Sequence, residues 1–171
     1  MKFKYLNILI TVIISLSLVC TFCNSKAKDH NSTESRKVFL RLINNSCVTI
    51  YSWDNLPLCF ENGVHKEGSA SGKILKPIIV SRFNSDSLEY AIAPMSYCGG
   101  GSGVFYFILL FARIHNHAVQ LACADVLEDG ILDSIRIDHN TIFVDLKHGD
   151  SIVIAKYLFR GNNLIDLKKK E

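Results

Sequence analysis

The chain has 171 residues, of which 49% are hydrophobic and 20% are charged, and its formal net charge is +3. This length fits one domain with a substantial hydrophobic core, and the composition excludes a largely disordered body. The positive residues gather at the two ends of the chain, so the folded part lacks the basic stripe of a nucleic-acid-binding protein.

The N-terminus has the pattern of an export segment. Lys2 and Lys4 precede a nearly continuous apolar run from Leu6 to Phe22, as a positive region precedes the hydrophobic region of a signal peptide. We therefore predict an apolar leader helix, a signal peptide or membrane anchor, over residues 1–27.

The processing of this leader has three alternatives. Small residues at Ser25 and Ala27 suit cleavage after Ala27 by a signal peptidase. Cys20 or Cys23 can instead be lipidated, although the residue before each is bulkier than a lipobox requires. An uncleaved leader would be a single-span anchor of minimal length.

Residues 28–37 are polar and are predicted as a tether, followed by one β-rich domain over residues 38–171. In the first half of this domain, strand-like segments alternate with turns rich in Asn, Asp, Gly and Ser. Predicted strands are Val38–Ile43, Cys47–Trp53 and Ile74–Phe83, and Pro77 within the last indicates an edge or a bulge. The stretch Gly68–Gly72 is predicted as a loop.

The second half shows a clearer strand pattern. Tyr90–Tyr97 and Val104–Ile114 flank a glycine loop that consists of Gly99, Gly100, Gly101, Ser102 and Gly103, which predicts a hairpin. Val104–Ala112 has no polar residue and is predicted as a central strand buried on both faces, with a buried helix as the competing interpretation. Further strands are predicted at Ala118–Ala124, Ile131–Ile137, Thr141–Leu146, Ser151–Phe159 and Leu164–Leu167. The fold class predicted is mainly β: a single antiparallel meander or sandwich-like domain after the leader.

Four cysteines lie in the body of the chain: Cys47, Cys59, Cys98 and Cys123. An oxidising compartment permits any of three pairings, and Cys47 with Cys59 is favoured because a hairpin would bring them together. The alternative is that they are small, buried, unpaired residues. Metal ligation by cysteine is not expected, since only Cys20 and Cys23 have the two-residue spacing of zinc sites.

Four segments in order resemble a family of uncharacterised bacterial exported proteins and lipoproteins: Glu61-Asn62-Gly63, Gly68-Ser69-Ala70-Ser71, Gly100–Tyr106 and Val126-Leu127-Glu128-Asp129. The resemblance implies an envelope location and a β-rich fold, and it implies no activity. Many members carry a calcium-loop spacing before the glycine loop. Here that stretch is Arg82–Ser87, with arginine in place of the first carboxylate and no glycine, so calcium binding is not expected.

Three kinds of chemistry have candidate residues, and each has a simpler interpretation. The glycine loop lacks the lysine and helix of a phosphate-binding loop, and a hairpin connection is the simpler interpretation. His115 and His117 could hold a metal with His139 or His148, but such pairs at turns are usually solvated. A hydrolytic set would combine Ser102 or Cys98 with a histidine and one of three aspartates, Asp129, Asp133 or Asp145. His and Asp favour turn positions in any case, and no nucleophile elbow surrounds either candidate nucleophile.

The sequence thus favours a non-enzymatic bacterial envelope protein, exported and in one alternative a lipoprotein, with a β-rich domain that acts as an interaction or structural module. Expected partners are the membrane, through the leader or a lipid anchor, and an envelope protein or cell-wall component; no nucleic acid and no cofactor are expected. The alternative is a small hydrolase or metal-dependent enzyme that uses the His115/His117 region.

Overall fold

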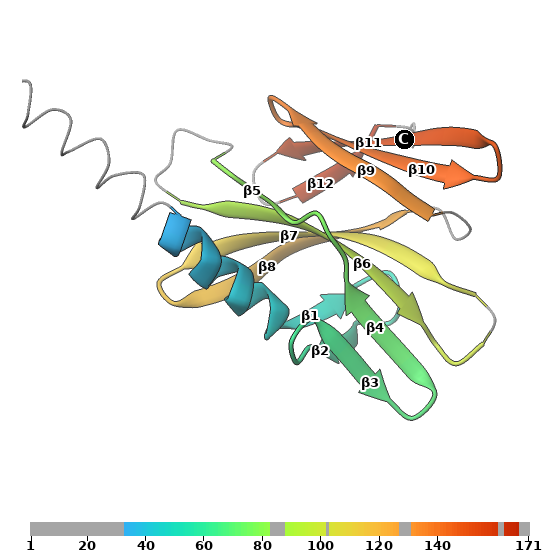
Figure 1. Ribbon diagram of the computed structural model, residues 1–171, viewed down its shortest axis with the longest axis horizontal. Helices are drawn as coiled ribbons and strands as arrows, with labels where there is room; N and C mark the ends of the chain where they lie inside the picture. The colour runs from blue at the N-terminus through green and yellow to red at the C-terminus, as the bar shows by residue number, and fades with distance from the viewer. Residues whose placement is uncertain (1–32, 83–87, 102, 127–130, 161–162, 168–171) are drawn as a thin grey trace, which may run out of the picture. The chain divides into compact units, whose positions relative to one another are not determined.

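The computed structural model describes residues 33–82, 88–101, 103–126, 131–160 and 163–167 (Figure 1). These residues form a mainly β structure, with twelve strands in three antiparallel sheets and one helix at residues 33–44. The predicted fold class is confirmed. The predicted leader, residues 1–27, lies outside the described residues. In the described part of the chain, no helix has both the length and the apolar character needed to cross a membrane.

The strands are distributed over three sheets. The two-stranded sheet pairs β1 (Cys47–Ile50) with β2 (Leu56–Cys59). The six-stranded sheet has the order β3-β4-β6-β7-β8, and β5 also pairs with β6. Its strands are β3 (Val64–Glu67), β4 (Ala70–Ile74), β5 (Ile79–Ser81), β6 (Tyr90–Cys98), β7 (Phe105–Ile114) and β8 (His117–Val126). The four-stranded sheet has the order β12-β11-β10-β9, with strands β9 (Ile131–Asp138), β10 (Thr141–His148), β11 (Ser151–Arg160) and β12 (Asn163–Asp166).

The helix at residues 33–44 replaces the predicted strand Val38–Ile43, so that prediction is wrong. Phe39 and Ile43 are fully buried, and a spacing of four residues places both on one face of a helix. The same spacing is even and would also fit one face of a strand, so the apolar pattern alone did not distinguish the two. The helix ends where the side chains of Asn44 and Asn45 donate hydrogen bonds to the carbonyls of Leu40 and Arg41, at 2.9 Å each.

The helix also reaches into the predicted tether. Residues 33–37 are helical, whereas residues 28–32 lie outside the described part, and a tethering role for residues 28–37 stays a prediction. The chain divides into two compact units, Met1–Val38 and Phe39–Glu171. All three sheets belong to the second unit.

Strand β7 lies at the centre of the second unit. It runs between β6 and β8, and every residue from Phe107 to Ala112 is buried. Successive side chains of a strand point to opposite faces, and Phe107, Leu109 and Phe111 accordingly join one core cluster. Ile108, Leu110 and Ala112 join the other cluster. The predicted central strand is confirmed, although its fully buried part is Phe107–Ala112 and Val104 is 41% exposed before the strand begins. The competing helix is excluded.

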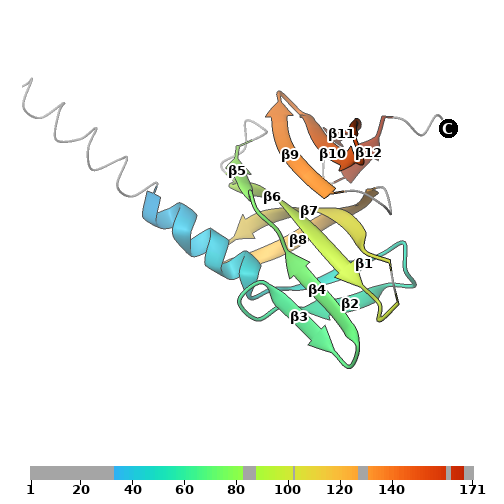
Figure 2. The ribbon, with the colours of Figure 1, turned by 45° about the vertical axis from the view of Figure 1, so that its right-hand side comes forward.

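Two layers cover the two faces of the six-stranded sheet (Figure 2). On one face lie Phe39 and Ile43 of the helix and the buried residues of the β1–β2 hairpin. On the other face lies the four-stranded sheet, whose strand β10 buries Ile142, Val144 and Leu146 and turns the intervening residues outward. The strand predicted at Thr141–Leu146 is therefore confirmed.

The first half of the domain differs from the prediction in its details. The predicted strand Ile74–Phe83 is interrupted: β4 ends at Ile74, β5 begins at Ile79, and the cis peptide bond Lys76–Pro77 lies between them. Proline has no N–H for the ladder, so the edge or bulge expected at Pro77 is observed as a break between two short strands that both pair with β6. Strand β4 also takes Ala70–Gly72 out of the predicted loop. Strands β2 and β3 were not predicted.

Candidate functional site

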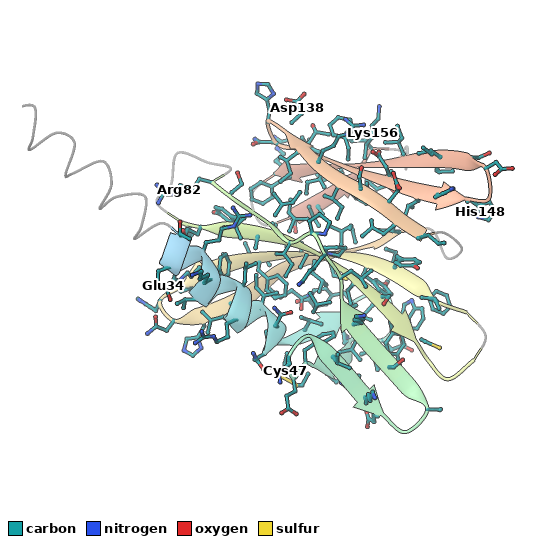
Figure 3. All side chains as sticks on the ribbon, viewed as in Figure 1. Glu34, Cys47, Arg82, Asp138, His148 and Lys156 are labelled. Atoms are coloured by element: carbon teal, nitrogen blue, oxygen red, sulfur yellow. A yellow bond between two sulfur atoms is a disulfide. The ribbon has the colours of Figure 1, made fainter. Side chains whose placement is uncertain are left out.

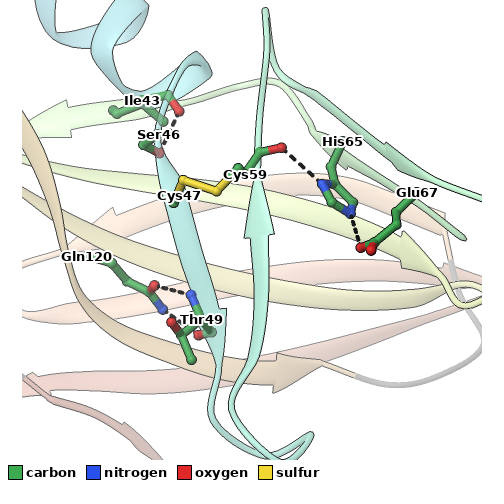
Figure 4. Close-up of a disulfide and its surroundings, with 8 residues drawn as sticks. All are labelled: Ile43, Ser46, Cys47, Thr49, Cys59, His65, Glu67 and Gln120. Atoms are coloured by element: carbon green, nitrogen blue, oxygen red, sulfur yellow. Dashed lines mark hydrogen bonds and ion pairs between the residues drawn. A yellow bond between two sulfur atoms is a disulfide. The ribbon is translucent and has the colours of Figure 1, made fainter.

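A disulfide closes the first hairpin (Figure 4). Cys47 and Cys59 lie opposite each other in the register of β1 and β2, with Cα atoms 3.9 Å apart, and their sulfurs are bonded. The favoured pairing is confirmed. Asp54 and Asn55 in the connecting turn both have positive φ, as in the type I′ turns that match the twist of paired strands. This turn sets the register that brings the two cysteines together.

One side chain fastens this hairpin to β8 (Figure 4). The amide of Gln120 donates to the carbonyl of Thr49 at 2.8 Å and accepts from the N–H of Thr49 at 2.6 Å. The Gln120 side chain thus makes with Thr49 the pair of hydrogen bonds that the backbone of a neighbouring strand would make. Trp53 of the hairpin turn packs edge-on against Tyr97 and Phe105, with ring centroids 5.5 and 4.5 Å apart. Polar and aromatic contacts therefore fix the hairpin on the domain.

His65 lies beside the disulfide (Figure 4). Its Nδ1 is 2.9 Å from the carbonyl oxygen of Cys59, and because a carbonyl only accepts, Nδ1 carries the proton. Its Nε2 is 3.8 Å from a carboxylate oxygen of Glu67. These contacts join β3 to the end of β2, which is a structural role.

The other two body cysteines are free thiols. Cys98 donates a weak hydrogen bond to the carbonyl of Gly101 at 3.4 Å. Burial, with a smaller contribution from the nearby Asp125 carboxylate, raises the pKa of the Cys123 thiol to about 12. A thiol with this pKa is protonated at neutral pH, so Cys123 is neither a nucleophile nor a ready metal ligand. The lipidation candidates Cys20 and Cys23 lie outside the described residues.

The glycine loop connects β6 to β7, as the predicted hairpin requires. Gly100 has φ of 91°, and a Cβ atom there would overlap the hydroxyl of Ser69. Close approach of the backbone thus explains a glycine at this position. A strand follows the loop instead of the helix N-terminus of a phosphate-binding loop, and Ser102 lies outside the described residues.

The candidate histidines lie on three separate turns. His115 lies in the β7–β8 turn and His117 begins β8, His139 lies between β9 and β10, and His148 ends β10. Figure 3 places Asp138, the neighbour of His139, and His148 at opposite ends of the four-stranded sheet. Among the described residues there is no group of three or more His, Cys, Asp or Glu side chains that could hold a metal ion.

The candidate hydrolytic residues are also separated. Cys98 and the glycine loop lie at one end of β7, and His115 and His117 lie at the other end. A strand of ten residues spans roughly 33 Å. Asp133 is exposed on β9, and Asp129 and the calcium-like stretch from residue 83 to 87 lie outside the described residues.

Asp145, the remaining candidate acid, is engaged within the four-stranded sheet. Its Oδ2 accepts a hydrogen bond from the hydroxyl of Ser134 at 2.7 Å and lies 3.6 Å from the guanidinium of Arg136. Its Oδ1 is buried and has no hydrogen-bond partner among the described residues. None of the candidate histidines takes part in this arrangement.

A pocket of about 400 Å³ lies where β8 meets β11, β12 and the β1–β2 turn. Its polar groups bind one another: Ser52 donates to the carboxylate of Asp125 at 2.6 Å, and Tyr157 donates to the carbonyl of Asp125 at 2.8 Å. Burial raises the pKa of Tyr157, with smaller contributions from Asp166, Asp125 and Cys123, so the phenol stays a hydrogen-bond donor. The hydrogen bonds around this pocket therefore connect the β1–β2 turn to β8 of the six-stranded sheet and β8 to β11 of the four-stranded sheet.

The outward face of the four-stranded sheet carries exposed apolar side chains. Ile131 and Ile152 are 68% and 61% exposed, and they flank Lys147 in the register of β9, β10 and β11. Ile154 lies two residues along β11, and Phe143 occupies the same face of β10. The Arg136 guanidinium lies 4.3 Å and the Lys156 ammonium 5.6 Å from the Phe143 ring centroid. We call Ile131, Phe143, Ile152 and Ile154 the outer patch.

Several of these contacts have no local signal in the sequence. Gln120 lies 71 residues from Thr49, and Tyr157 lies 32 residues from Asp125. The outer patch does have a signal, since Ser151–Phe159 is apolar on both faces of the predicted strand. Comparison of the chain with known protein families, with curated proteins and with solved structures finds no match.

Proposed function

We propose that this chain is a non-enzymatic bacterial envelope protein, exported by its leader, whose β domain binds another envelope component through the outer patch. The observation that carries the proposal is the exposure of Ile131 and Ile152 on the outward face of the four-stranded sheet. Exposed apolar side chains gathered on one face cost solubility and mark interaction surfaces in soluble domains. The inward face of the same sheet supplies the core, so these outward residues are not needed to cover it.

The charges around the outer patch indicate the chemistry of the partner. Arg136, Lys147 and Lys156 lie on the same face, and two of them stack on Phe143. Asp145 also lies on this face and pairs with Arg136, so the cations remain in excess. A partner surface with apolar groups and carboxylates would match both the isoleucines and these cations. A protein segment of this composition is the partner that we propose.

The face of the sheet suits binding better than its β9 edge. Strand β9 forms one of the two edges, and its register shifts near Asp133, the residue that is passed over between Leu132 and Ser134 in the pairing with β10. A bulge and an exposed charge on an edge strand hinder the addition of a further strand. Binding through the edge is therefore disfavoured.

The disulfide supports an exported location. Stable disulfides form in oxidising compartments such as the bacterial periplasm and are rare in the cytosol. The bond between Cys47 and Cys59 agrees with the leader predicted over residues 1–27 and with the family resemblance of the sequence.

Site-specific photo-crosslinking in cells tests the proposed function. A photoreactive amino acid at Ile152 is expected to form a discrete protein adduct that is recovered in the envelope fraction. The matched control is Ile114, an isoleucine that is 38% exposed at the end of β7 and lies outside the outer patch. The adduct should disappear when Ile131→Asp and Ile154→Asp are introduced together, because both changes place carboxylates on the proposed contact.

Two results would overturn the proposal. One is the absence of an adduct at Ile152, or equal adducts at Ile152 and Ile114. The other is loss of the adduct when His115→Asn and His117→Asn are combined, because these turn histidines lie outside the outer patch and belong to the alternative enzymatic hypothesis.

A further inference from the structure

A second pocket lies on a different part of the domain, where the helix end, the β2–β3 turn and β4 meet. Its volume is about 420 Å³, within the range of small-molecule sites. The helix end contributes Arg41, the turn contributes Asn62 and Gly63, and Lys73 and Lys76 come from β4 and the residues after it. The β1–β2 hairpin and the outer patch take no part in it.

Hydrogen bonds fix the floor of this pocket. The N–H of Gly63 donates to the carbonyl of Asn44 at 2.7 Å, and the N–H of Ile74 donates to the carbonyl of Gly63 at 2.8 Å. The N–H of Asn62 donates to the side-chain oxygen of Asn45 at 3.1 Å. Three segments of the chain are thereby joined, so the pocket exists before any ligand binds.

Gly63 is the residue that permits this junction. It is buried, its φ is 80°, and a Cβ atom there would lie 2.7 Å from Oδ1 of Asn44. Any other residue would be strained in its backbone at this φ, and its Cβ would force the Asn44 side chain to shift.

The charge of the pocket is one-sided. Arg41, Lys73 and Lys76 line it, and no Asp or Glu does. None of the three cations forms an ion pair with another residue in the part of the chain that the structure describes. Arg41 has a local explanation, because cations near a helix C-terminus are favoured by the helix dipole. Lys73 and Lys76 are exposed lysines outside the helix, and the fold brings both to the same pocket.

We propose that this pocket binds a phosphate group, either free or carried by a small molecule or a lipid head group. Three cations suit a phosphate monoester, which carries about −1.5 to −2 charges at neutral pH, better than a single carboxylate. The planar guanidinium of Arg41 can bind two phosphate oxygens at once, and the lysines act as point charges. Val64 and Ile74 also line the pocket and offer apolar contact to the rest of an organic phosphate. This site is independent of the outer patch and of the proposed function.

The test uses the full chain, purified in detergent, and measures binding by calorimetry. The probes are inorganic phosphate, glycerol 3-phosphate and a short-chain, water-soluble phosphatidic acid, whose head group is a phosphate monoester. At least one probe should bind with 1:1 stoichiometry, and the amide resonances of Asn62, Gly63 and Ile74 should shift on its addition. Binding of glycerol 3-phosphate indicates a soluble ligand, whereas binding of the lipid alone indicates a head group.

Charge-neutral variants locate the site. Combining Lys73→Gln with Lys76→Gln should weaken binding by about tenfold or more, because two charge-assisted contacts are lost. The control is Arg160→Gln, an exposed cation at the end of β11 outside this pocket, which should leave affinity unchanged. Circular dichroism checks that each variant is folded. The proposal fails if no probe binds, or if Arg160→Gln weakens binding as much as the pocket variant does.

Discussion

Removal of the disulfide should lower the free energy of unfolding by about 3 kcal/mol. Cys47 and Cys59 are separated by 12 residues, and cross-linking a loop of this length removes chain entropy worth about 3 kcal/mol from the unfolded state. Both cysteines are exposed, so replacing them with serine removes little buried apolar surface. Domains are stable by about 5–15 kcal/mol, so the variant Cys47→Ser/Cys59→Ser should still fold.

Urea unfolding followed by two probes measures this effect. Trp53 is the single tryptophan and lies in the turn of the same hairpin, so its fluorescence reports on that hairpin, and circular dichroism reports on the sheets. The fluorescence transition of the variant should move to lower urea by at least as much as the dichroism transition. Cys98→Ser, which removes a free thiol, is the control and should change stability by no more than about 0.5 kcal/mol. An oxidised wild type no more stable than the double variant would refute the reasoning.

Three further perturbations test other contacts. Gln120→Ala should lower the free energy of unfolding, measured in urea, by about 2 kcal/mol, because two hydrogen bonds to Thr49 are lost. An unchanged unfolding midpoint would show that other contacts hold the hairpin. Gly63→Ala should lower the free energy of unfolding, measured by thermal unfolding, by about 1–3 kcal/mol. Gly101→Ala, where a Cβ meets open space, should lower it much less. Equal losses in the two variants would contradict the strain argument. The free energy of unfolding should fall as pH rises above about 9. In that range Cys123 ionises in the unfolded chain, whereas in the folded chain it keeps its proton up to about pH 12, so the unfolded state binds fewer protons. Tyr157, whose pKa is also raised, adds to the same trend at higher pH. The decline should be shallower in Cys123→Ala/Tyr157→Phe, and an equally steep decline would show that other groups cause it.

The parts of the fold that were predictable are those fixed by local chemistry. An uninterrupted apolar run with glycines before it identified β7, because only a central strand needs apolar residues on both faces. The pairing of Cys47 with Cys59 was predicted from a hairpin between them, and a tight turn at Asp54-Asn55 does place the two cysteines opposite each other. Both inferences depend on residues that are close in sequence.

The parts that were missed depend on contacts between distant residues. The helix at residues 33–44 was missed because Phe39 and Ile43 satisfy both a helical and an even spacing, and packing against the sheet decided between them. The two pockets were missed because each combines residues from three or more separate segments. In the sequence, the only indication of the outer patch is that the segment of β11 has apolar residues on both faces. Which of these residues are exposed depends on which face of the sheet packs against the rest of the domain.

A location outside the cytoplasm is the claim on which the proposed function depends, and the mass of the native protein tests it most directly. The protein would be recovered from the envelope fraction, its free thiols alkylated, and its intact mass determined before and after reduction. We expect a chain that lacks all or part of residues 1–27, or carries a lipid on Cys20 or Cys23, with one disulfide and with Cys98 reduced. A cytosolic chain that begins at Met1 and has both Cys47 and Cys59 alkylated without reduction would contradict this expectation.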